Sequence, residues 1–484
     1  MSIFSASQLA AWTDGTWTPQ APERVTGFHF DSRQIVPGDL FVALRSERRD
    51  GHDFVAAAAD QGAAAALVSR GMPHPLPQLV VHDPLTALHA IARAHRAAWP
   101  HPVVGITGSV GKTSTKDLLA HLLGRETTAA TPGNFNNHLG VPLSILQAEP
   151  NVHQALVLEA GTNSPGEIAQ LAELIQPLVA IVTSVGPAHL DRLHDLAGVA
   201  AEKAALLQAA TAPELAIFPA ELTTYQPFQH ISCHAWPVYQ GDGPAEAGRV
   251  VYQTTKLETG TSETDRQVSV YQPQPAPSDA AVGLTIWLPP EVVPGGEPVR
   301  ATFHSCSEGM ARNAALAVAA AARLGVSPKT IAERLQSWRP LEDRGSWREQ
   351  GGRSYYVDCY NANPKSFVDS LQAFHQHCSA PPRVFVLGAM FELGAERARW
   401  HRWVAERIPA HAGDRIILVG EGSDAYLPGL LVFQRSGVMV TQVATAEAAS
   451  ELLKASDAPV YLKGGHASRL EVLAPKAEEV SHAD

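Results

Sequence analysis

A lysine and a threonine lie at the end of a glycine-rich turn that joins a predicted strand to a predicted helix. Residues 102–123 read PVVGITGSVGKTSTKDLLAHLL. The apolar run Val103–Ile106 suits a buried strand, and leucines recur at helical spacing after Lys112. Backbone N–H groups of such a turn converge on an anion at the positive end of the helix dipole. We therefore expect Lys112 to reach the β- and γ-phosphates of a nucleotide and the Thr113 hydroxyl to bind magnesium.

The glycines of this turn fall on every third residue, at Gly105, Gly108 and Gly111. The strict P-loop pattern G-x-x-x-x-G-K-[ST] is not met, because Ile106 occupies the position of its first glycine. An ordinary glycine turn before a helix is the alternative. The intact GKTS after a good strand favours a phosphate cradle, formed by Gly108, Gly111, Lys112, Thr113 and Ser114.

A carboxylate and an imidazole follow two further predicted strands. Glu159 ends the run LVLE, and His189 comes just after VAIVTSVG. The carboxyl ends of parallel strands meet at one edge of a sheet, so both side chains should lie on the same rim as Thr113. Alone, Glu159 could serve a helix N-terminus and His189 could be a packing residue. Their shared placement favours a magnesium or nucleotide site.

Two polar loops could bind a substrate. DSRQIVPGD, residues 31–39, offers Ser32 and Arg33 to a phosphate or carboxylate, although the residues of this loop alone favour a plain surface turn. TPGNFNNHLG, residues 131–140, carries three asparagines. Asparagine supplies both donors and acceptors but also forms turns. We therefore predict, without excluding a turn role, that Asn134, Asn136 and Asn137 bind substrate.

The length of 484 residues suggests about three domains, and the patterning predicts an α/β fold in each. Residues 1–98 should form a small mixed α/β domain. Residues 99–338 should form a P-loop-type domain with a parallel sheet. This central domain should carry antiparallel strands at about 240–300, such as RVVYQTTKL, RQVSVYQ and GLTIWLPP. Residues 339–484 should form a Rossmann-like parallel sheet. The first strand of this sheet ends in a cluster of Asp358, Tyr360, Asn361 and Asn363.

Composition excludes several classes of protein. A net charge of −11 argues against a nucleic-acid-binding surface. The four cysteines, Cys233, Cys306, Cys359 and Cys378, are far apart, which indicates a reducing compartment and no zinc module. The N-terminus lacks the pattern of a signal peptide, and no apolar run approaches the ~20 residues of a membrane span. We expect a cytoplasmic, monomeric protein that does not bind a membrane.

These segments, in this order, resemble the Mur ligase family, whose members are three-domain, ATP-dependent, amide-forming enzymes of peptidoglycan synthesis. DSRQIVPGDLFVAL with RDGHDF resembles the UDP-binding domain of the family, and GITGSVGKTST resembles its ATP cradle. NFNNHLGVPLSIL and VDCYNANPKSF look like the member that joins D-alanyl-D-alanine to UDP-N-acetylmuramoyl-tripeptide, using ATP and magnesium. The resemblance covers nearly the whole chain apart from residues 240–300.

The resemblance also implies roles for individual residues. Lys203 alone reads as a surface lysine of an apolar helix, but it matches the family lysine that becomes an anionic carbamate and holds a second magnesium ion. The implied metal ligands are Thr113, Glu159, His189 and Lys203, and the implied catalytic residues are Lys112, His189 and Lys203. The implied nucleotide contacts beyond the cradle are Asn313, Arg344, Asp358, Tyr360 and Asn361. The residues predicted to bind the substrates are Ser32, Arg33, Asn134, Asn136, Asn137 and Asn363.

Two alternatives stay open. The chain departs from the common family pattern at Asp343, Val357, Ala389 and 465–467. These departures would suit a ligase for another amino substrate, or a catalytically silent nucleotide-binding paralogue. A P-loop NTPase that is not a ligase fits less well, because it would have no use for the loop 31–39 or for the helix of Lys203.

Overall fold

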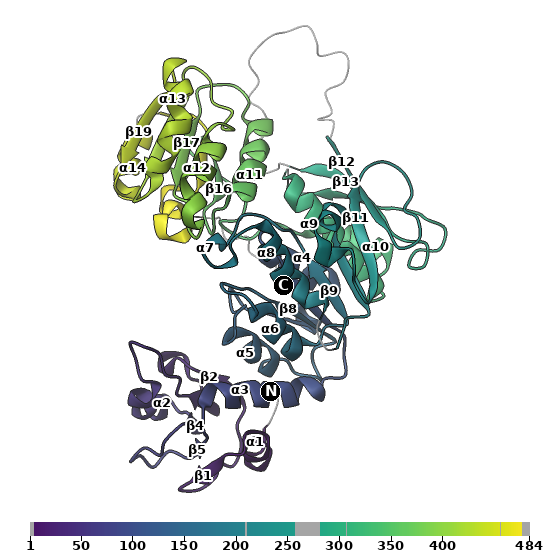
Figure 1. The fold of residues 1–484 in the computed structure, drawn as a ribbon, viewed down its shortest axis with the longest axis vertical. Coiled ribbons are helices and arrows are strands. Elements are labelled where there is room, and N and C mark those ends of the chain that lie inside the picture. Colours follow the sequence, from purple (N-terminus) through teal and green to yellow (C-terminus); the bar gives the residue numbers. More distant parts are fainter. Residues whose placement is uncertain (1–3, 209–210, 257–280, 306, 455, 477–484) are drawn as a thin grey trace.

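The computed structural model describes residues 4–208, 211–256, 281–305, 307–454 and 456–476. They build three successive sheets along the chain, each with its own helices (Figure 1). The prediction of three α/β units, with a mixed sheet first and largely parallel sheets after it, is confirmed. The precise domain bounds stay a prediction.

The N-terminal sheet has five strands in the order β1-β5-β4-β3-β2. The strands are β1 Thr16–Thr18, β2 Gly27–His29, β3 Asp39–Val42, β4 Ala65–Val68 and β5 Gln78–Val80, and the helices are α1 Ala6–Thr13, α2 Val55–Asp60 and α3 Pro84–Ala97. Only β1 runs antiparallel to its neighbour. Helix α3 begins at Pro84 because the Asp83 carboxylate accepts the Thr86 N–H at 2.8 Å. Its apolar face joins this sheet to helices of the central part.

The central sheet has nine strands in the order β14-β13-β12-β11-β10-β9-β6-β8-β7. The strands are β6 Val103–Thr107, β7 Thr128–Ala130, β8 Ala155–Glu159, β9 Val179–Val182, β10 Leu215–Pro219, β11 His234–Gln240, β12 Val250–Lys256, β13 Val282–Trp287 and β14 Val299–Phe303. The helices are α4 Lys112–Leu123, α5 Gly140–Leu146, α6 Glu167–Ile175, α7 Leu190–Leu193, α8 Leu196–Ala204, α9 Glu308–Arg323 and α10 Pro328–Ser337. Strands β6 to β12 are mutually parallel, so the carboxyl ends of β6, β8 and β9 share one edge of the sheet.

The expected antiparallel elaboration at 240–300 is only partly correct. Strands β12, β13 and β14 are antiparallel, but β11 and β12 are parallel. The pair is staggered, because Val238 near the end of β11 faces Val250 at the start of β12. A short loop can therefore join two parallel strands without a helix, which alternation of residues does not reveal. The segment RQVSVYQ lies outside the described residues.

The C-terminal sheet has six strands in the order β15-β16-β20-β17-β18-β19. The strands are β15 Ser346–Gln350, β16 Arg353–Asp358, β17 Val384–Gly388, β18 Arg415–Val419, β19 Met439–Val443 and β20 Val460–Lys463, and the helices are α11 Pro364–His377, α12 Arg397–Ala405, α13 Leu427–Arg435 and α14 Ala446–Leu453. All neighbours except β15 and β16 are parallel. After β20, two 3₁₀ turns, His466–Ser468 and Leu470–Leu473, flank Arg469, which has a left-handed φ of 50°.

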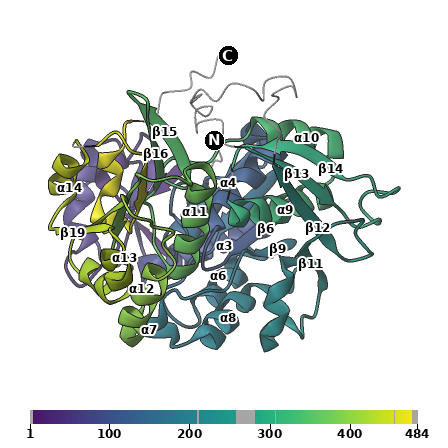
Figure 2. The ribbon, with the colours of Figure 1, turned by 90° about the horizontal axis from the view of Figure 1, so that it is seen from above.

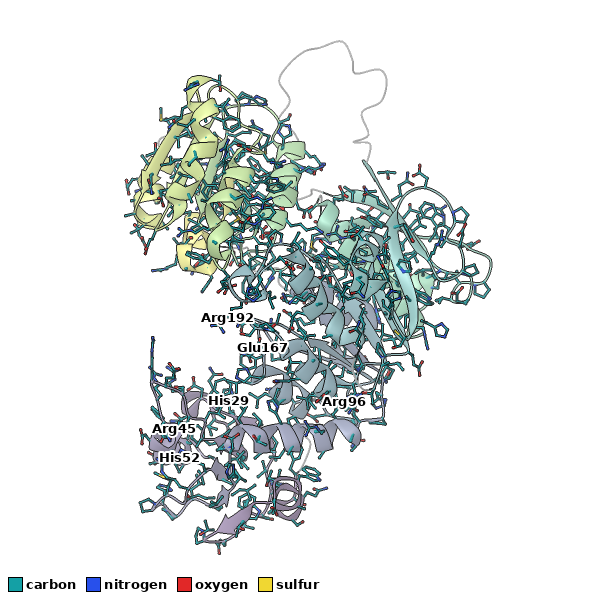
Figure 3. All side chains as sticks on the ribbon, in the orientation of Figure 1. His29, Arg45, His52, Arg96, Glu167 and Arg192 are labelled. Atoms are coloured by element: carbon teal, nitrogen blue, oxygen red, sulfur yellow. The ribbon has the colours of Figure 1, made fainter. Side chains whose placement is uncertain are left out.

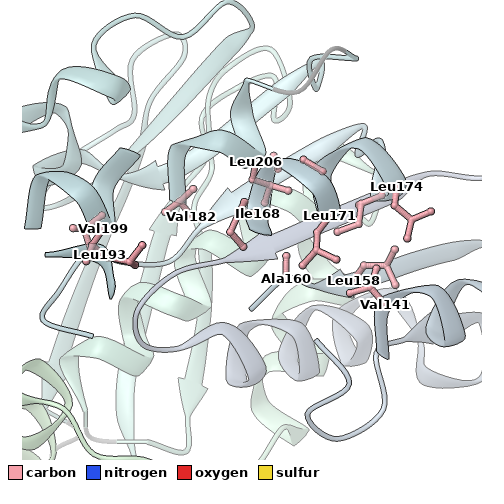
Figure 4. Packing of buried hydrophobic residues seen from close by; sticks show 14 of the residues in the cluster. Val141, Leu158, Ala160, Ile168, Leu171, Leu174, Val182, Leu193, Val199 and Leu206 are labelled. Carbon is pink, nitrogen blue, oxygen red and sulfur yellow. The ribbon is translucent and has the colours of Figure 1, made fainter. Parts of the chain in front are cut away.

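Buried apolar side chains fix the helices on the sheets. In Figure 4, Ile168 and Leu171 of α6 lie close to Leu158 of β8 and Val182 of β9. On the other face of the sheet, α9 packs on α4, which carries the glycine turn (Figure 2). No helix in the described ranges is long and apolar enough to span a bilayer. Cys233, Cys359 and Cys378 are free thiols, and Cys306 lies outside the described residues.

A fully buried ion pair ties β17 to β18. Arg383 Nη2 lies 2.6 Å from Asp414 Oδ2, and neither side chain is exposed. Asp414 also accepts the N–H groups of Arg383 and His411 at 2.8 Å. Asp414→Ala would leave a buried guanidinium unpaired, so we expect it to lower the free energy of unfolding by about 3–5 kcal/mol. Urea unfolding and hydrogen exchange of the β17 and β18 amides measure this. The exposed Asp457→Ala is the control, and equal stability of the two variants would contradict the prediction.

Candidate functional site

A cavity of about 750 Å³ lies between the central and C-terminal sheets. Its walls are the loops after β6, β7, β8 and β9, the start of α9, and residues of β16, α11 and α12. Ligands of open α/β sheets bind at such strand ends. The cavity brings together most of the predicted site residues: Gly111, Lys112, Thr113, Ser114, Asn134, Asn136, Asn137, Glu159, His189, Asn313, Arg344, Asp358, Tyr360, Asn361 and Asn363. It does not include Gly108, Lys203, Ser32 or Arg33 among its lining residues.

The glycine turn is held by the strand beside it. Val110 N–H donates to Ser184 Oγ at 2.9 Å, and Ser109 Oγ donates to the Gly186 carbonyl at 3.1 Å. Gly108 has a φ of 146°, and a Cβ there would lie 2.0 Å from Thr183 Oγ1. Only glycine lets the turn pass this close to β9, which leaves the loop backbone free to surround an anion.

Replacement of Gly108 tests the cradle directly. Gly108→Ala must move the turn away from Thr183, and strain of ~1–3 kcal/mol corresponds to a loss of ATP affinity of about 5- to 150-fold. Titration calorimetry with ATP measures the change. Gly71→Ala is the matched control, because a Cβ at Gly71 meets nothing within 4 Å. ATP binding by Gly108→Ala at the parent affinity would contradict the cradle.

Lys112 opens α4 with its ammonium turned back toward the turn. Its Nζ donates to the Gly108 carbonyl at 2.8 Å. Burial lowers the pKa of Lys112, and the nearby Glu159 carboxylate opposes this shift. The cation is therefore held at the cavity wall within the field of an anion, where an approaching phosphate group would find it.

Glu159 presents an unsatisfied carboxylate oxygen at the end of β8. Its Oε1 accepts the Asn136 amide at 2.7 Å, and its backbone N–H donates to Thr131 Oγ1. Oε2 is buried and has no partner among the described residues. A buried, unpaired carboxylate oxygen is costly unless a cation binds it. With Thr113 and His189 in the same cavity, the donor set fits magnesium.

The unmodified side chains form only part of such a site. Across the described ranges, no group of three His, Cys, Asp or Glu side chains could hold a metal ion. A complete ligand set would therefore draw on the Thr113 hydroxyl, on a ligand of another kind, and on water, which magnesium commonly keeps.

Lys203 lies behind the cavity wall, on α8, with 1% of its side chain exposed. Burial lowers its pKa well below the usual range of a lysine, and the Lys112 cation adds to the shift. The preceding Glu202 accepts the N–H groups of Gly166 and Ile168 at the start of α6. Lys203 is therefore a core lysine, and the reading of a solvent-facing, snorkelling side chain is wrong.

Residues of two other segments line the cavity with the glycine turn. Asn313, on α9, is buried directly against Gly111, where a Cβ would lie 2.4 Å from Asn313 Nδ2. The Arg344 guanidinium stacks 3.8 Å above the centre of the Tyr360 ring. A planar cation on an aromatic ring offers a flat edge for a base and charge for a phosphate.

Asp358 and the buried Lys463 form an ion pair on the neighbouring strands β16 and β20. Lys463 Nζ also donates to the Asn361 carbonyl at 2.9 Å. Burial raises the pKa of Asp358, and the Lys463 cation counters part of that shift. The pair fixes the loop that carries Tyr360 and Asn361 into the cavity.

The predicted asparagines have different local partners. Asn137 Oδ1 accepts the N–H groups of Leu139 and Gly140 where α5 begins. Asn363 caps α11 by accepting the Ser366 N–H at 3.0 Å. Asn134 lines the cavity, and Asn136 bonds Glu159. Their roles toward substrate stay predictions, and two of them also serve the turns that we weighed as alternatives.

Ser32 and Arg33 lie apart from the cavity, in the N-terminal part. Ser32 is buried, and Arg33 pairs with Asp31 at 2.6 Å. Their loop approaches the asparagine loop, because the rings of Phe30 and Phe135 lie 6.3 Å apart. Figure 3 labels His29 in this region of the N-terminal part, and Glu167 and Arg192 on the central part. A ligand that reaches both Ser32 and Lys112 must span the two parts.

Sequence reasoning missed residues that join the two sheets around the cavity. Asp369 of α11 accepts the Ser307 hydroxyl and the Gly309 N–H at the start of α9. Glu392, after β17, pairs with His189. Glu392 could have been found as a carboxylate beyond the carboxyl end of a parallel strand. For Asp369 the sequence holds no signal, because its partners are some sixty residues away.

Three family models match the chain. They are the Mur ligase family catalytic domain over residues 24–96, the Mur ligase middle domain over 106–268, and the Mur ligase glutamate ligase domain over 343–464. Together with the relatives below, they show that the chain belongs to the Mur ligase family, a class of ATP-dependent ligases.

Its relatives include two enzymes named UDP-N-acetylmuramoyl-tripeptide--D-alanyl-D-alanine ligase. The one from Bacillus subtilis is 30% identical over 86% of this chain and 85% of its own length. The one from Escherichia coli is 32% identical over 82% of this chain and 81% of its own length. A crystal structure of MurF from Acinetobacter baumannii superposes with a TM-score of 0.80 at 27% identity, covering 98% of both chains.

Proposed function

We propose that this chain joins D-alanyl-D-alanine to UDP-N-acetylmuramoyl-tripeptide, converting ATP to ADP and phosphate, as a cytoplasmic step of peptidoglycan synthesis. One observation carries the proposal. A single cavity holds a glycine cradle with Lys112, an unsatisfied Glu159 oxygen, and polar residues from a second sheet. The similarity to D-alanyl-D-alanine ligases supports the choice of substrates.

The reaction begins with a carboxylate that is a poor electrophile. One of its oxygens attacks the γ-phosphorus of ATP, the bond to the β-phosphate oxygen breaks, and ADP leaves with those electrons. The product is an acyl phosphate. The dipeptide amine then attacks the acyl carbon, loses a proton, and phosphate departs from the tetrahedral intermediate. Activation by phosphoryl transfer thus gives the carboxylate a good leaving group.

Two anions must approach each other in the first step. Lys112 lies at the cavity wall, where it would neutralise charge on the β- and γ-phosphates. Bound magnesium, held by Thr113, Glu159 and His189, would polarise the phosphoryl oxygens. Asn313 and the Arg344–Tyr360 stack would orient the nucleotide. Residues of α11 and α12 line the cavity, where they would hold the dipeptide with its amine facing the cradle.

The predicted carbamate on Lys203 can be tested by NMR. Only a neutral amine reacts with carbon dioxide, and the lowered pKa of Lys203 favours that form. We expect ¹³C-bicarbonate to give a carbamate resonance in the ¹³C NMR spectrum of the parent protein. Lys203→Arg should lack it. Lys116→Arg should keep it, because Lys116 is a second buried lysine, bonded to the Thr131 carbonyl. A signal that survives Lys203→Arg would contradict the prediction.

The function is tested by phosphate release from ATP by the purified chain. UDP-N-acetylmuramoyl-tripeptide is supplied with and without D-alanyl-D-alanine, and the product is identified by mass. Release that needs both substrates, with the mass gain of the dipeptide less one water, supports the proposal. Phosphate release with another amine would keep the ligase mechanism but change the amino substrate, and Ala389 and His466 would be the first residues to test for that specificity. Tight ATP binding without release would favour the silent paralogue.

A further inference from the structure

Glu392 pairs with His189 across the boundary between the C-terminal and central sheets. Glu392 Oε2 lies 2.7 Å from His189 Nδ1. The Glu392 carbonyl accepts the N–H of Leu190, the first residue of α7, at 2.9 Å. One residue of the loop after β17 therefore contacts the side chain of His189 and the backbone that follows it.

The backbone on both sides of this contact is held in unusual conformations. His189 has a φ of 54° and Glu392 a φ of 60°, in the left-handed region that non-glycine residues seldom adopt. A Cβ at Gly394 would lie 3.2 Å from Asp191 Cα, so the loop lies tightly against α7. Strained residues of this kind persist where the surrounding structure fixes them, and they cluster at functional sites.

The pairing decides which nitrogen of His189 can bind a cation. The Glu392 carboxylate lies beside Nδ1, which makes no hydrogen bond of regular geometry among the described residues. The neighbouring negative charge favours a proton on Nδ1, so Nε2 keeps its lone pair. A histidine that binds a metal usually donates its other N–H to such a partner, which fixes the ring. His189 lines the cavity and Glu392 does not. Its contact with the site therefore runs through His189, and its charge also acts on Lys112.

We propose that Glu392 is a positioning residue that the C-terminal domain supplies to the magnesium site of the central domain. Docking of the loop 391–394 on α7 orients the His189 ring, so domain contact and metal binding are coupled. The inference rests on the magnesium role that the proposed function gives to His189. It adds a residue that neither the glycine turn nor the strand-end pattern of the central sheet contains.

The test measures metal binding without turnover. Mn²⁺ serves as the probe for magnesium, and its affinity is determined by electron paramagnetic resonance on the full chain with a non-hydrolysable ATP analogue. We expect Glu392→Ala to weaken Mn²⁺ binding about 10- to 100-fold. Glu392→Gln keeps the size of the side chain and an oxygen that can accept from Nδ1, so it should recover part of the loss. Glu396→Ala is the control, because that partly exposed glutamate pairs with Arg399 in the same segment.

A double-mutant cycle separates orientation of His189 from a general effect on folding. In a His189→Ala background, Glu392→Ala should cause no further loss of Mn²⁺ affinity. Equal Mn²⁺ affinity of the parent and Glu392→Ala would overturn this inference alone. A further loss in the His189→Ala background would also overturn it. If the parent protein binds the nucleotide analogue but does not bind the added Mn²⁺, the magnesium role in the proposed function is overturned, and this inference with it.

Discussion

Replacing Lys112 with alanine should lower turnover by about 10³-fold, the largest effect that we expect from any single substitution. The Lys112 ammonium bonds the Gly108 carbonyl at the cavity wall, where no other side chain of the glycine turn carries a positive charge. Its loss would leave the phosphate charge uncompensated in the phosphoryl-transfer step. Rapid-quench measurement of ADP formation isolates this step from product release.

Two further variants make the result specific. Lys329→Ala removes an exposed lysine at the start of α10 and should leave turnover unchanged. Lys112→Arg keeps the charge with a different shape and should recover part of the rate. Turnover of Lys112→Ala close to that of the parent would show that the glycine turn does not bind the reacting phosphates.

Glu159→Gln should reduce turnover about 100-fold, with a higher magnesium concentration needed for half-maximal rate. The substitution keeps the size of the side chain and an acceptor for the Asn136 amide, but it removes the charge on the buried Oε2. Magnesium titration of the initial rate distinguishes a lost metal ligand from a lost substrate contact.

Asn136→Ala is the matched comparison for Glu159. It removes the hydrogen bond to Glu159 but leaves the carboxylate charge, so the magnesium dependence of the rate should change less than in Glu159→Gln. An unaltered magnesium requirement in Glu159→Gln would exclude this carboxylate from the metal site.

Local patterns predicted the parts of the site that neighbouring residues determine. The apolar run before Gly108 and the leucine spacing after Lys112 were sufficient to place β6, the turn and α4. Strand ends predicted that Glu159 and His189 share a cavity, because parallel strands deliver their carboxyl ends to one edge. The resemblance added Asn313 and Arg344, whose segments carry no independent chemical signal, and the structure places both at the cavity.

Long-range geometry accounts for what the sequence could not predict. The parallel pairing of β11 and β12 depends on the stagger of Val238 and Val250, which residue alternation does not encode. Strand β15 forms because Gly351 and Gly352 both adopt positive φ and turn the chain into a hairpin. Glu392 meets His189 only because two sheets dock, and the sequence separates them by about two hundred residues.

The cap at the start of α9 is a contact between two domains, because the capping carboxylate belongs to the C-terminal domain. Asp369 accepts the Gly309 N–H and the Ser307 hydroxyl, so the C-terminal domain satisfies donors that would otherwise turn to water. The same helix carries Asn313 to the glycine turn. Thermodynamic reciprocity then applies: if nucleotide binding favours the docked arrangement, docking must tighten nucleotide binding by the same factor. In that case, an inhibitor that holds the two domains apart would weaken ATP binding even if it did not contact the nucleotide.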